Sequence, residues 1–150
     1  MESNRPAILI AAPRAVIGRL SAAIADAVEV IGAETWDEAL ERLQNAEPEV
    51  IVVCYVFDEM RPFRLLHYLR HEWRKDWVPT LLVRAVPVKL GATDETQIRE
   101  SYMTLGVDQF INLHDEEEAK GKAAALERFR EAVLRRLGSR LEATHRSSLQ

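Results

Sequence analysis

The chain has 150 residues, of which 47% are hydrophobic and 29% are charged, as in a single globular domain. Its formal net charge of −4 excludes a basic nucleic-acid-binding protein. A single cysteine excludes an internal disulfide, and a reducing cytoplasm is the expected location.

The chain opens with a predicted strand and helix. Residues 1–6 lead into only a short apolar run, too short for a signal peptide or a membrane-spanning helix. That run, residues 7–11, ends before Pro13 and is typical of a buried strand. Apolar residues then recur at helical spacing from Val16 to Ile24, which predicts the first helix.

A second strand and helix follow. Residues 28–31 alternate weakly before Gly32, which suggests a strand. Thr35 and Glu38 have the spacing of a capping box, which predicts the start of a helix. Because proline disfavours helical backbone at the residue before it, this helix is expected to stop before Pro48.

The segment 48–55, Pro-Glu-Val-Ile-Val-Val-Cys-Tyr, is the clearest strand of the chain. A short continuous apolar run is typical of a parallel strand that is buried on both faces of its sheet. The strand is expected to end at Cys54, so the residue at its end is a thiol and not a carboxylate.

The second half of the chain repeats this alternation. A helix is expected to begin at Pro62, and a strand is expected over residues 80–83. A helix with a capping signal at Asp94 is expected to end at Gly106, since glycine favours the left-handed helix cap. Residues 107–111 form the fifth predicted strand.

A last, extended helix is predicted after the fifth strand. The acidic run from Asp115 to Glu118 places negative charge where a helix amino end favours it. We expect this helix to end before Gly138, the domain to span residues 1–137, and residues 138–150 to be a loose polar tail. Its outer apolar positions would be exposed in a monomer, which predicts a homodimer or a partner helix. The apolar positions are Leu126, Phe129, Val133, Leu137 and Leu141.

Five strand-helix units in succession predict an α/β fold with a parallel sheet that is covered on both faces. The leading topology is a five-stranded doubly wound sheet in the flavodoxin-like order 2-1-3-4-5 with an extended C-terminal helix. In this topology ligands bind beyond the carboxyl ends of the strands, where strands 1 and 3 are neighbours. Any site is therefore expected at that crevice.

The residues at these strand ends are poor in catalytic chemistry. They are Ala12, Pro13, Cys54, Arg84 and Leu113. The turn after the first strand lacks the glycine pattern of a phosphate cradle, and the first strand offers no carboxylate for a cation. No catalytic residue, metal or cofactor is therefore expected.

The order and spacing of three segments resemble a response-regulator receiver domain over residues 7–135. Residues 48–53 resemble the third strand of that family, residues 78–82 its fourth strand, and residues 106–110 the start of its fifth. The resemblance implies a CheY-like fold and a role in bacterial two-component signalling.

The functional residues of that family do not carry over to this chain. The resemblance places its acidic pair at Ala12 and Pro13 and its phosphoacceptor aspartate at Cys54. It places the serine or threonine after the fourth strand at Arg84, and the lysine after the fifth at Leu113. Only the switch aromatic has a match, which is Phe110. The resemblance therefore implies a degenerate receiver that lacks a phosphorylation site.

The predicted function is that of a non-enzymatic signalling module that acts through protein contacts. Expected partners are a signalling kinase, a regulator or an output protein, with a second copy of the chain as a further candidate; neither nucleic acid nor a membrane is expected. The resemblance implies an interaction face around the fourth helix, the fifth strand and the last helix. Its expected residues are Tyr102, Phe110, Phe129, Val133 and Leu137.

Two alternatives remain open. The crevice could hold a thiol redox sensor or a small-ligand or enzyme site that uses Cys54 and Arg84. A closed pocket filled by Val56, Phe57 and Leu113 would favour the signalling module, and an accessible thiol would favour the alternative. A shifted alignment with Asp58 as phosphoacceptor is the other alternative, although it would still lack the carboxylates of the first strand.

Charged side chains elsewhere allow further hypotheses. Arg84 could pair with Asp58 or Glu59, or its guanidinium could reach solvent. His67 and His71 have the spacing of helical metal ligands, but they point away from the apolar face and are interpreted as a surface pair. The third-helix region is basic and is interpreted as a solvated face or a docking patch for an acidic partner. Its basic residues are Arg61, Arg64, Arg70, Arg74 and Lys75.

Overall fold

The computed structural model describes residues 5–60, 62–75, 77–85 and 100–148, with side chains over 5–58, 62–75, 77–85 and 100–138. Five parallel strands form one sheet in the order β2-β1-β3-β4-β5, which confirms the predicted topology. The strands are β1 (Ala7–Ala11), β2 (Glu29–Ala33), β3 (Val50–Cys54), β4 (Thr80–Arg84) and β5 (Gln109–Asn112).

The middle of the sheet is the most apolar part of the chain. Every residue of β3 and of β4 is buried, as expected for parallel strands with helices on both sides. The two neighbours of β3 are β1 and β4, so the 48–55 run lies at the centre of the sheet. The apolar composition of this run is therefore explained by its burial at the centre of the sheet.

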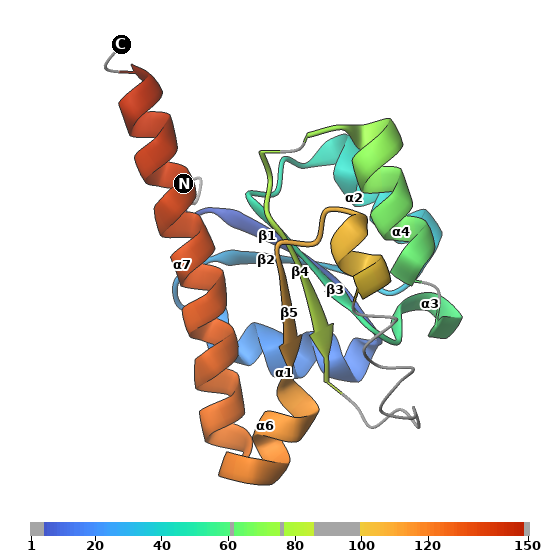
Figure 1. Cartoon of the computed structure of the whole chain (residues 1–150), viewed down its shortest axis with the longest axis vertical. Helices are drawn as coiled ribbons and strands as arrows, with labels where there is room; N and C mark the ends of the chain where they lie inside the picture. Colours follow the sequence, from blue (N-terminus) through green and yellow to red (C-terminus); the bar gives the residue numbers. More distant parts are fainter. Residues whose placement is uncertain (1–4, 61, 76, 86–99, 149–150) are drawn as a thin grey trace.

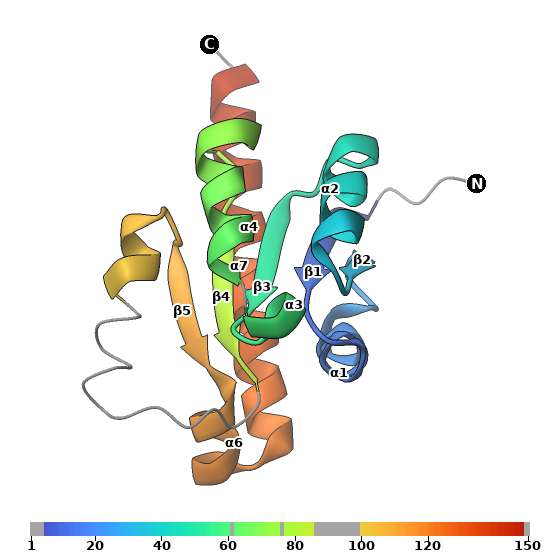
Figure 2. The ribbon, with the colours of Figure 1, turned by 90° about the vertical axis from the view of Figure 1, so that its right-hand side faces the viewer.

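Helices α1 (Arg14–Ile24) and α7 (Lys122–Ser148) cover one face of the sheet, as Figures 1 and 2 show. Leu20 and Ile24 of α1 pack into the same core cluster as Phe129 and Val133 of α7. Arg130 of α7 is paired with Asp26 just after α1, and this pair holds the pKa of the Asp26 carboxyl below its usual value. Apolar packing and the ion pair between Arg130 and Asp26 thus hold α7 in place along the sheet.

The opposite face is covered by the middle helices of the chain. They are α2 (Trp36–Asn45), α3 (Phe57–Met60), α4 (Pro62–Tyr68), the π-helical turn η1 (Leu69–Trp73) and a helical turn at residues 100–104. The predicted capping box at α2 is confirmed, since the Glu38 amide donates to the Thr35 hydroxyl over 3.2 Å. The expected capping signal at Asp94 lies outside the described residues.

The carboxyl-terminal part differs from the expectation in two ways. Two helices replace one: α6 (Leu113–Lys120) ends at Gly121, whose φ of 95° favours glycine, and α7 then begins. The predicted helix end before Gly138 is wrong, because α7 continues to Ser148 and extends beyond the sheet (Figure 1). Residues 138–148 are therefore helical rather than a loose tail. The side chain of Leu141 lies outside the described residues.

Candidate functional site

The carboxyl edge of the sheet brings the strand ends of the chain together. In the observed register Ala11 lies beside Val53, Cys54 beside Val83, and Arg84 beside Asn112. Ala12 follows β1 directly, and Leu113 begins α6 directly after β5. The fold thus places Ala12, Cys54, Arg84 and Leu113 along one edge, with Pro13 at the start of α1.

The floor of this edge is apolar and closed. Ala12, Cys54 and Phe57 have no exposed surface, and Leu113 is 1% exposed. Val56 is half-buried and packs against the same core. Of the two predicted pocket states, the described residues at this edge match the closed one.

The thiol at the end of β3 is buried in an apolar core cluster. Burial raises the pKa of the Cys54 thiol above its usual value, so the neutral form is favoured. A reactive cysteine instead has a lowered pKa and an accessible sulfur. The environment of Cys54 therefore favours a packing role over a redox role.

Arg84 is the charged residue of this edge, and it is bound by the start of α6. Its Nη1 donates to Asp115 Oδ1 over 3.2 Å and to Asn112 Oδ1 over 3.4 Å. The same Asn112 oxygen caps α6 by accepting from the Asp115 amide over 3.0 Å. Arg84 is only 9% exposed, so the alternative in which it reaches solvent is wrong.

Asp58, one of the two expected partners of Arg84 and the alternative phosphoacceptor, binds the amino end of α2. The side chain of Glu59, the other expected partner, lies outside the described residues. The Asp58 Oδ2 accepts from the backbone N–H of Trp36 over 3.0 Å, at the first residue of α2. Asp58 also has a positive φ of 43°, a backbone conformation that residues other than Gly, Asn and Asp seldom adopt. It therefore links the segment after β3 to the amino end of α2.

The Asp115 partner of Arg84 was not recognised from the sequence. The sequence pattern explains the acidic run from Asp115 to Glu118 only by the preference of a helix amino end for negative charge, and Asp115 and Glu116 do lie in the first turn of α6. The position of this run just after the fifth strand, which is the neighbour of the fourth in the expected sheet, was the available signal for a contact with Arg84. Only the register of those two strands shows that Arg84 lies next to it.

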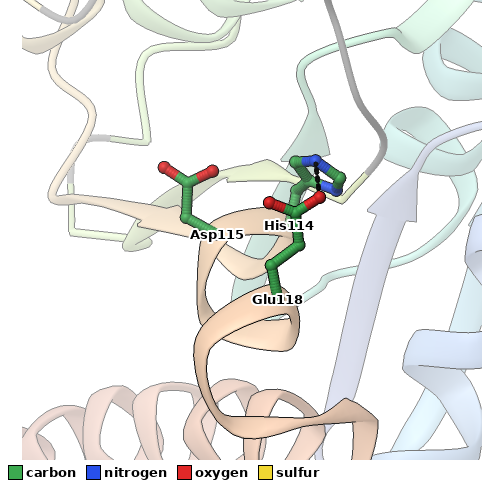
Figure 3. Close-up of side chains that lie close together, drawn as sticks. All are labelled: His114, Asp115 and Glu118. Carbon is green, nitrogen blue, oxygen red and sulfur yellow. Dashed lines mark ion pairs between the residues drawn. The ribbon is translucent and has the colours of Figure 1, made fainter.

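One group of metal-ligand type occurs among the described residues, although no metal was predicted. Ligand atoms of His114, Asp115 and Glu118 lie within 4.8 Å of one another on α6 (Figure 3). His114 Nε2 pairs with Glu118 Oε1 over 3.3 Å, and Asp115 binds Arg84. Both carboxylates are exposed, so this group is explained by ion pairs on a helix surface.

The histidine pair on α4 and η1 agrees with its interpretation as a surface feature. The rings of His67 and His71 lie with their centroids 4.4 Å apart, and both residues are exposed. The group of ligand-type side chains found among the described residues lies on α6 and contains neither His67 nor His71.

No protein-family model matches the sequence, and no curated protein matches it. Solved structures do match. The chemotaxis response regulator CheY4 of Vibrio cholerae is similar at a TM-score of 0.64 and 15% identity, over 89% of this chain and 99% of that one. The phosphorylated cyanobacterial phytochrome response regulator RcpA is similar at 0.66 and 15%, over 85% and 91%. NtrX from Brucella abortus is similar at 0.70 and 16%, over 97% of this chain and 30% of that one.

The chain has the fold of response-regulator receiver domains. At these identities the likeness shows the fold alone. Among the described residues, no helix combines the length and apolar character that crossing a membrane requires.

The expected interaction face of this receiver fold needs correction. Phe129 and Val133 have no exposed surface, and Leu137 and Tyr102 are also buried. The three residues of α7 pack in one core cluster, whereas Tyr102 and the half-buried Phe110 pack in the cluster on the other side of the sheet. These five residues therefore do not form one exposed surface, because the apolar stripe of α7 is used to cover the sheet.

Three aromatic residues form a row from the sheet toward solvent. The Tyr102 ring lies edge-on to Tyr55 at 5.9 Å and 6.0 Å from the Phe63 ring. Burial raises the pKa of Tyr102 to about 12. Phe63 is exposed, so this row is anchored at the end of β3 and ends at the surface of α4.

Proposed function

We propose that this chain is a receiver-like signalling module that accepts no phosphoryl group and acts through contacts with other proteins. The observation that carries the proposal is the closed carboxyl edge, where Ala12, Cys54 and Leu113 are buried and Arg84 is bound by Asp115. The fold shared with receivers supports a role in two-component signalling.

The chemistry of phosphoryl transfer supports this reading of the edge. Aspartyl phosphorylation requires a carboxylate nucleophile, carboxylates that hold Mg²⁺, and a cation that stabilises the phosphoryl oxygens. Ala12 and Cys54 supply none of these groups, and Arg84 is already bound by Asp115. A buried apolar floor also disfavours a dianionic group, since burial of an unpaired charge is costly.

The partners that this proposal implies are proteins. A signalling kinase, a regulator or an output protein in the cytoplasm is the expected class, with a second copy of the chain as a further candidate. The degenerate edge supports no enzymatic step, and the balance of charge favours no nucleic acid. Binding is expected to use exposed side chains, because the core residues of α7 are not accessible.

The test is incubation of the chain with acetyl phosphate and Mg²⁺, followed by intact-mass measurement. We expect no hydroxylamine-labile gain of a phosphoryl group, whereas RcpA, whose phosphorylated form has been solved, serves as the positive control. The matched variant is Asp58→Asn, which removes the alternative acceptor considered in the sequence analysis. A labile phosphoryl adduct on the natural chain that disappears in this variant would establish Asp58 as an acceptor and overturn the proposal.

A further inference from the structure

A groove lies at the amino edge of the sheet, opposite the closed carboxyl edge. It consists of two adjoining hollows of about 120 Å³ and about 160 Å³ that share Trp73, Lys75 and Val78. The first hollow reaches Arg70 and Gly106 before β5, and the second reaches Pro48 and Trp77 before β3 and β4. We refer to these two hollows together as the amino-edge groove.

The wall of the groove is built by an irregular helix end. The π-helical turn η1 ends at Trp73, and Arg74 then adopts a left-handed φ of 57°. The Val78 amide donates to the Lys75 carbonyl over 3.0 Å, which closes a turn between them. Lys75 Nζ lies 5.0 Å from the centre of the Trp73 ring. Single π-helical turns occur often at functional sites.

The absence of a side chain at Gly106 leaves room for the guanidinium of Arg70 in the groove. The φ of Gly106 is 89°, which side chains disfavour. A Cβ atom at this position would lie 2.9 Å from Nη1 of Arg70, closer than ordinary contact allows. The glycine therefore both caps the preceding helical turn and leaves the space in which the Arg70 guanidinium lies.

The cations of the groove are not neutralised within the described part of the chain. Arg70 and Lys75 form no ion pair there, although the whole chain has a net charge of −4. Among the described residues, the charged side chains that line the first hollow are Arg70 and Lys75, whereas Glu47 and Glu49 line the second hollow together with Lys75. The positive charge is therefore concentrated at the Arg70 end.

The aromatic floor of the groove is partly open to solvent. Trp77 is 64% exposed, the largest exposure among the large hydrophobic residues of the described chain. Exposed tryptophan beside arginine is enriched at protein-binding surfaces. Each hollow is smaller than the roughly 300–1,000 Å³ of a typical small-molecule pocket, and its size suits a single side chain.

We propose that the amino-edge groove binds an acidic peptide segment of a protein partner. A carboxylate of the segment pairs with Arg70 and Lys75 in the first hollow. A neighbouring apolar side chain packs on Trp73 and Trp77 in the second. The inference deepens the proposed function, on which it rests for the class of partner, and it concerns the edge opposite the one where phosphorylation is tested.

The test uses the three tryptophans of the chain as reporters. The isotope-labelled protein is titrated with short acetylated peptides in which Asp or Glu alternates with Phe or Leu, while indole N–H signals are followed by NMR. We expect the Trp73 and Trp77 signals to shift. The Trp36 signal is the internal reference, because that ring packs edge-on against Tyr68 and under Arg64 at 4.4 Å, away from the groove lining.

The decisive variant is Arg70→Glu with Lys75→Glu, which reverses the charge at the groove. We expect its affinity for the acidic peptides to fall about tenfold or more, since like charges in contact disfavour binding. The matched control is Arg128→Glu with Arg135→Glu, which makes the same change of charge at exposed positions of α7. Its affinity should stay within about twofold of the natural chain, because distant charges are screened.

Four outcomes would overturn the inference. They are equal binding of peptides with Lys in place of the acids, no binding at about 1 mM peptide, unchanged affinity in the Arg70→Glu, Lys75→Glu variant, and signal shifts on simple concentration of the protein. The last result would identify a second copy as the occupant. None of the four alters the phosphoryl mass test, so failure of the groove and failure of the proposed function are distinguishable.

Discussion

At the carboxyl edge of the sheet the residues that follow the strands are buried, whereas at the amino edge two hollows lie beside the strand starts. Cys54 and Phe57 have no exposed surface at the first edge, and its cation, Arg84, is bound by Asp115. At the second edge Trp77 is exposed and Arg70 and Lys75 have no ion-pair partner within the described residues. The two edges thus differ in both access and charge.

This difference shows that a chain can keep the topology of a doubly wound sheet without keeping an open ligand site at the carboxyl ends of its strands. A doubly wound sheet normally binds ligands beyond the carboxyl ends of its strands. Here the same topology is retained, but apolar side chains fill that position and take the role of core residues. Such an edge contributes stability to the fold, and binding is expected to use other surfaces.

The largest contrast should come from removing one aromatic side chain at each edge. Phe57→Ala is expected to lower the free energy of unfolding by about 3–5 kcal/mol, because it opens a cavity beside β3. Trp77→Ala is expected to change it by less than about 0.5 kcal/mol, since the ring is largely exposed. Urea denaturation of both variants measures the contrast. Similar losses for the two would contradict the proposed difference between the edges.

A second, smaller effect should follow from placing a carboxylate at the end of β3. Cys54→Asp is expected to destabilise the fold by about 2–4 kcal/mol at neutral pH, because the new charge is buried. Burial raises the folded-state pKa of such a carboxyl. The penalty should therefore shrink as the pH falls through that raised pKa toward about 4, where the unfolded carboxyl also binds its proton.

Cys54→Ser is the matched control for that variant, since it is close in size and uncharged. The difference in stability between Cys54→Ser and the natural chain should be nearly independent of pH over the same range, as measured by urea denaturation of both proteins at each pH. Cys54→Asp should also remain unmodified by acetyl phosphate and Mg²⁺, because Ala12 supplies no metal ligand. A stable, phosphorylated Cys54→Asp protein would show that the carboxyl edge is open.

The smallest effect concerns the ion pair that closes the carboxyl edge. Arg84→Met retains the apolar stem and removes the charge, and we expect a loss of about 1 kcal/mol in the free energy of unfolding. Asp115→Asn removes the other charge. A double-mutant cycle on these two positions should give a coupling energy that decreases with added salt. Coupling near zero would mean that Asp115 does not hold Arg84.

The strands could be predicted from the sequence because their signal is local. The apolar stretches at 7–11 and 50–54 each have the length of one strand, and the structure places both in the sheet interior. The capping box at Thr35 is likewise local, since both of its hydrogen bonds lie within one helical turn. The break between α6 and α7 was not predicted, although the sequence has a glycine there; the structure shows that Gly121 adopts a positive φ at this break.

The candidate site was predictable only in part. The sequence placed Ala12, Cys54 and Arg84 at strand ends, and the register confirms that these ends share one edge. The Asp115 partner of Arg84 and the burial of the α7 stripe were not predicted. Helical periodicity shows which side chains share a face, but it contains no information on whether the sheet or a partner protein covers that face.

The sequence by itself determined the order of the strands and helices, the parallel sheet, and the absence of acidic residues at Ala12 and Cys54. Each of these follows from short-range patterns or from residue identity. Only the tertiary structure decided that Arg84 binds Asp115 and that Arg70, Lys75 and Gly106 line one groove. These contacts join segments about 30 residues apart, and their geometry depends on strand register and helix packing.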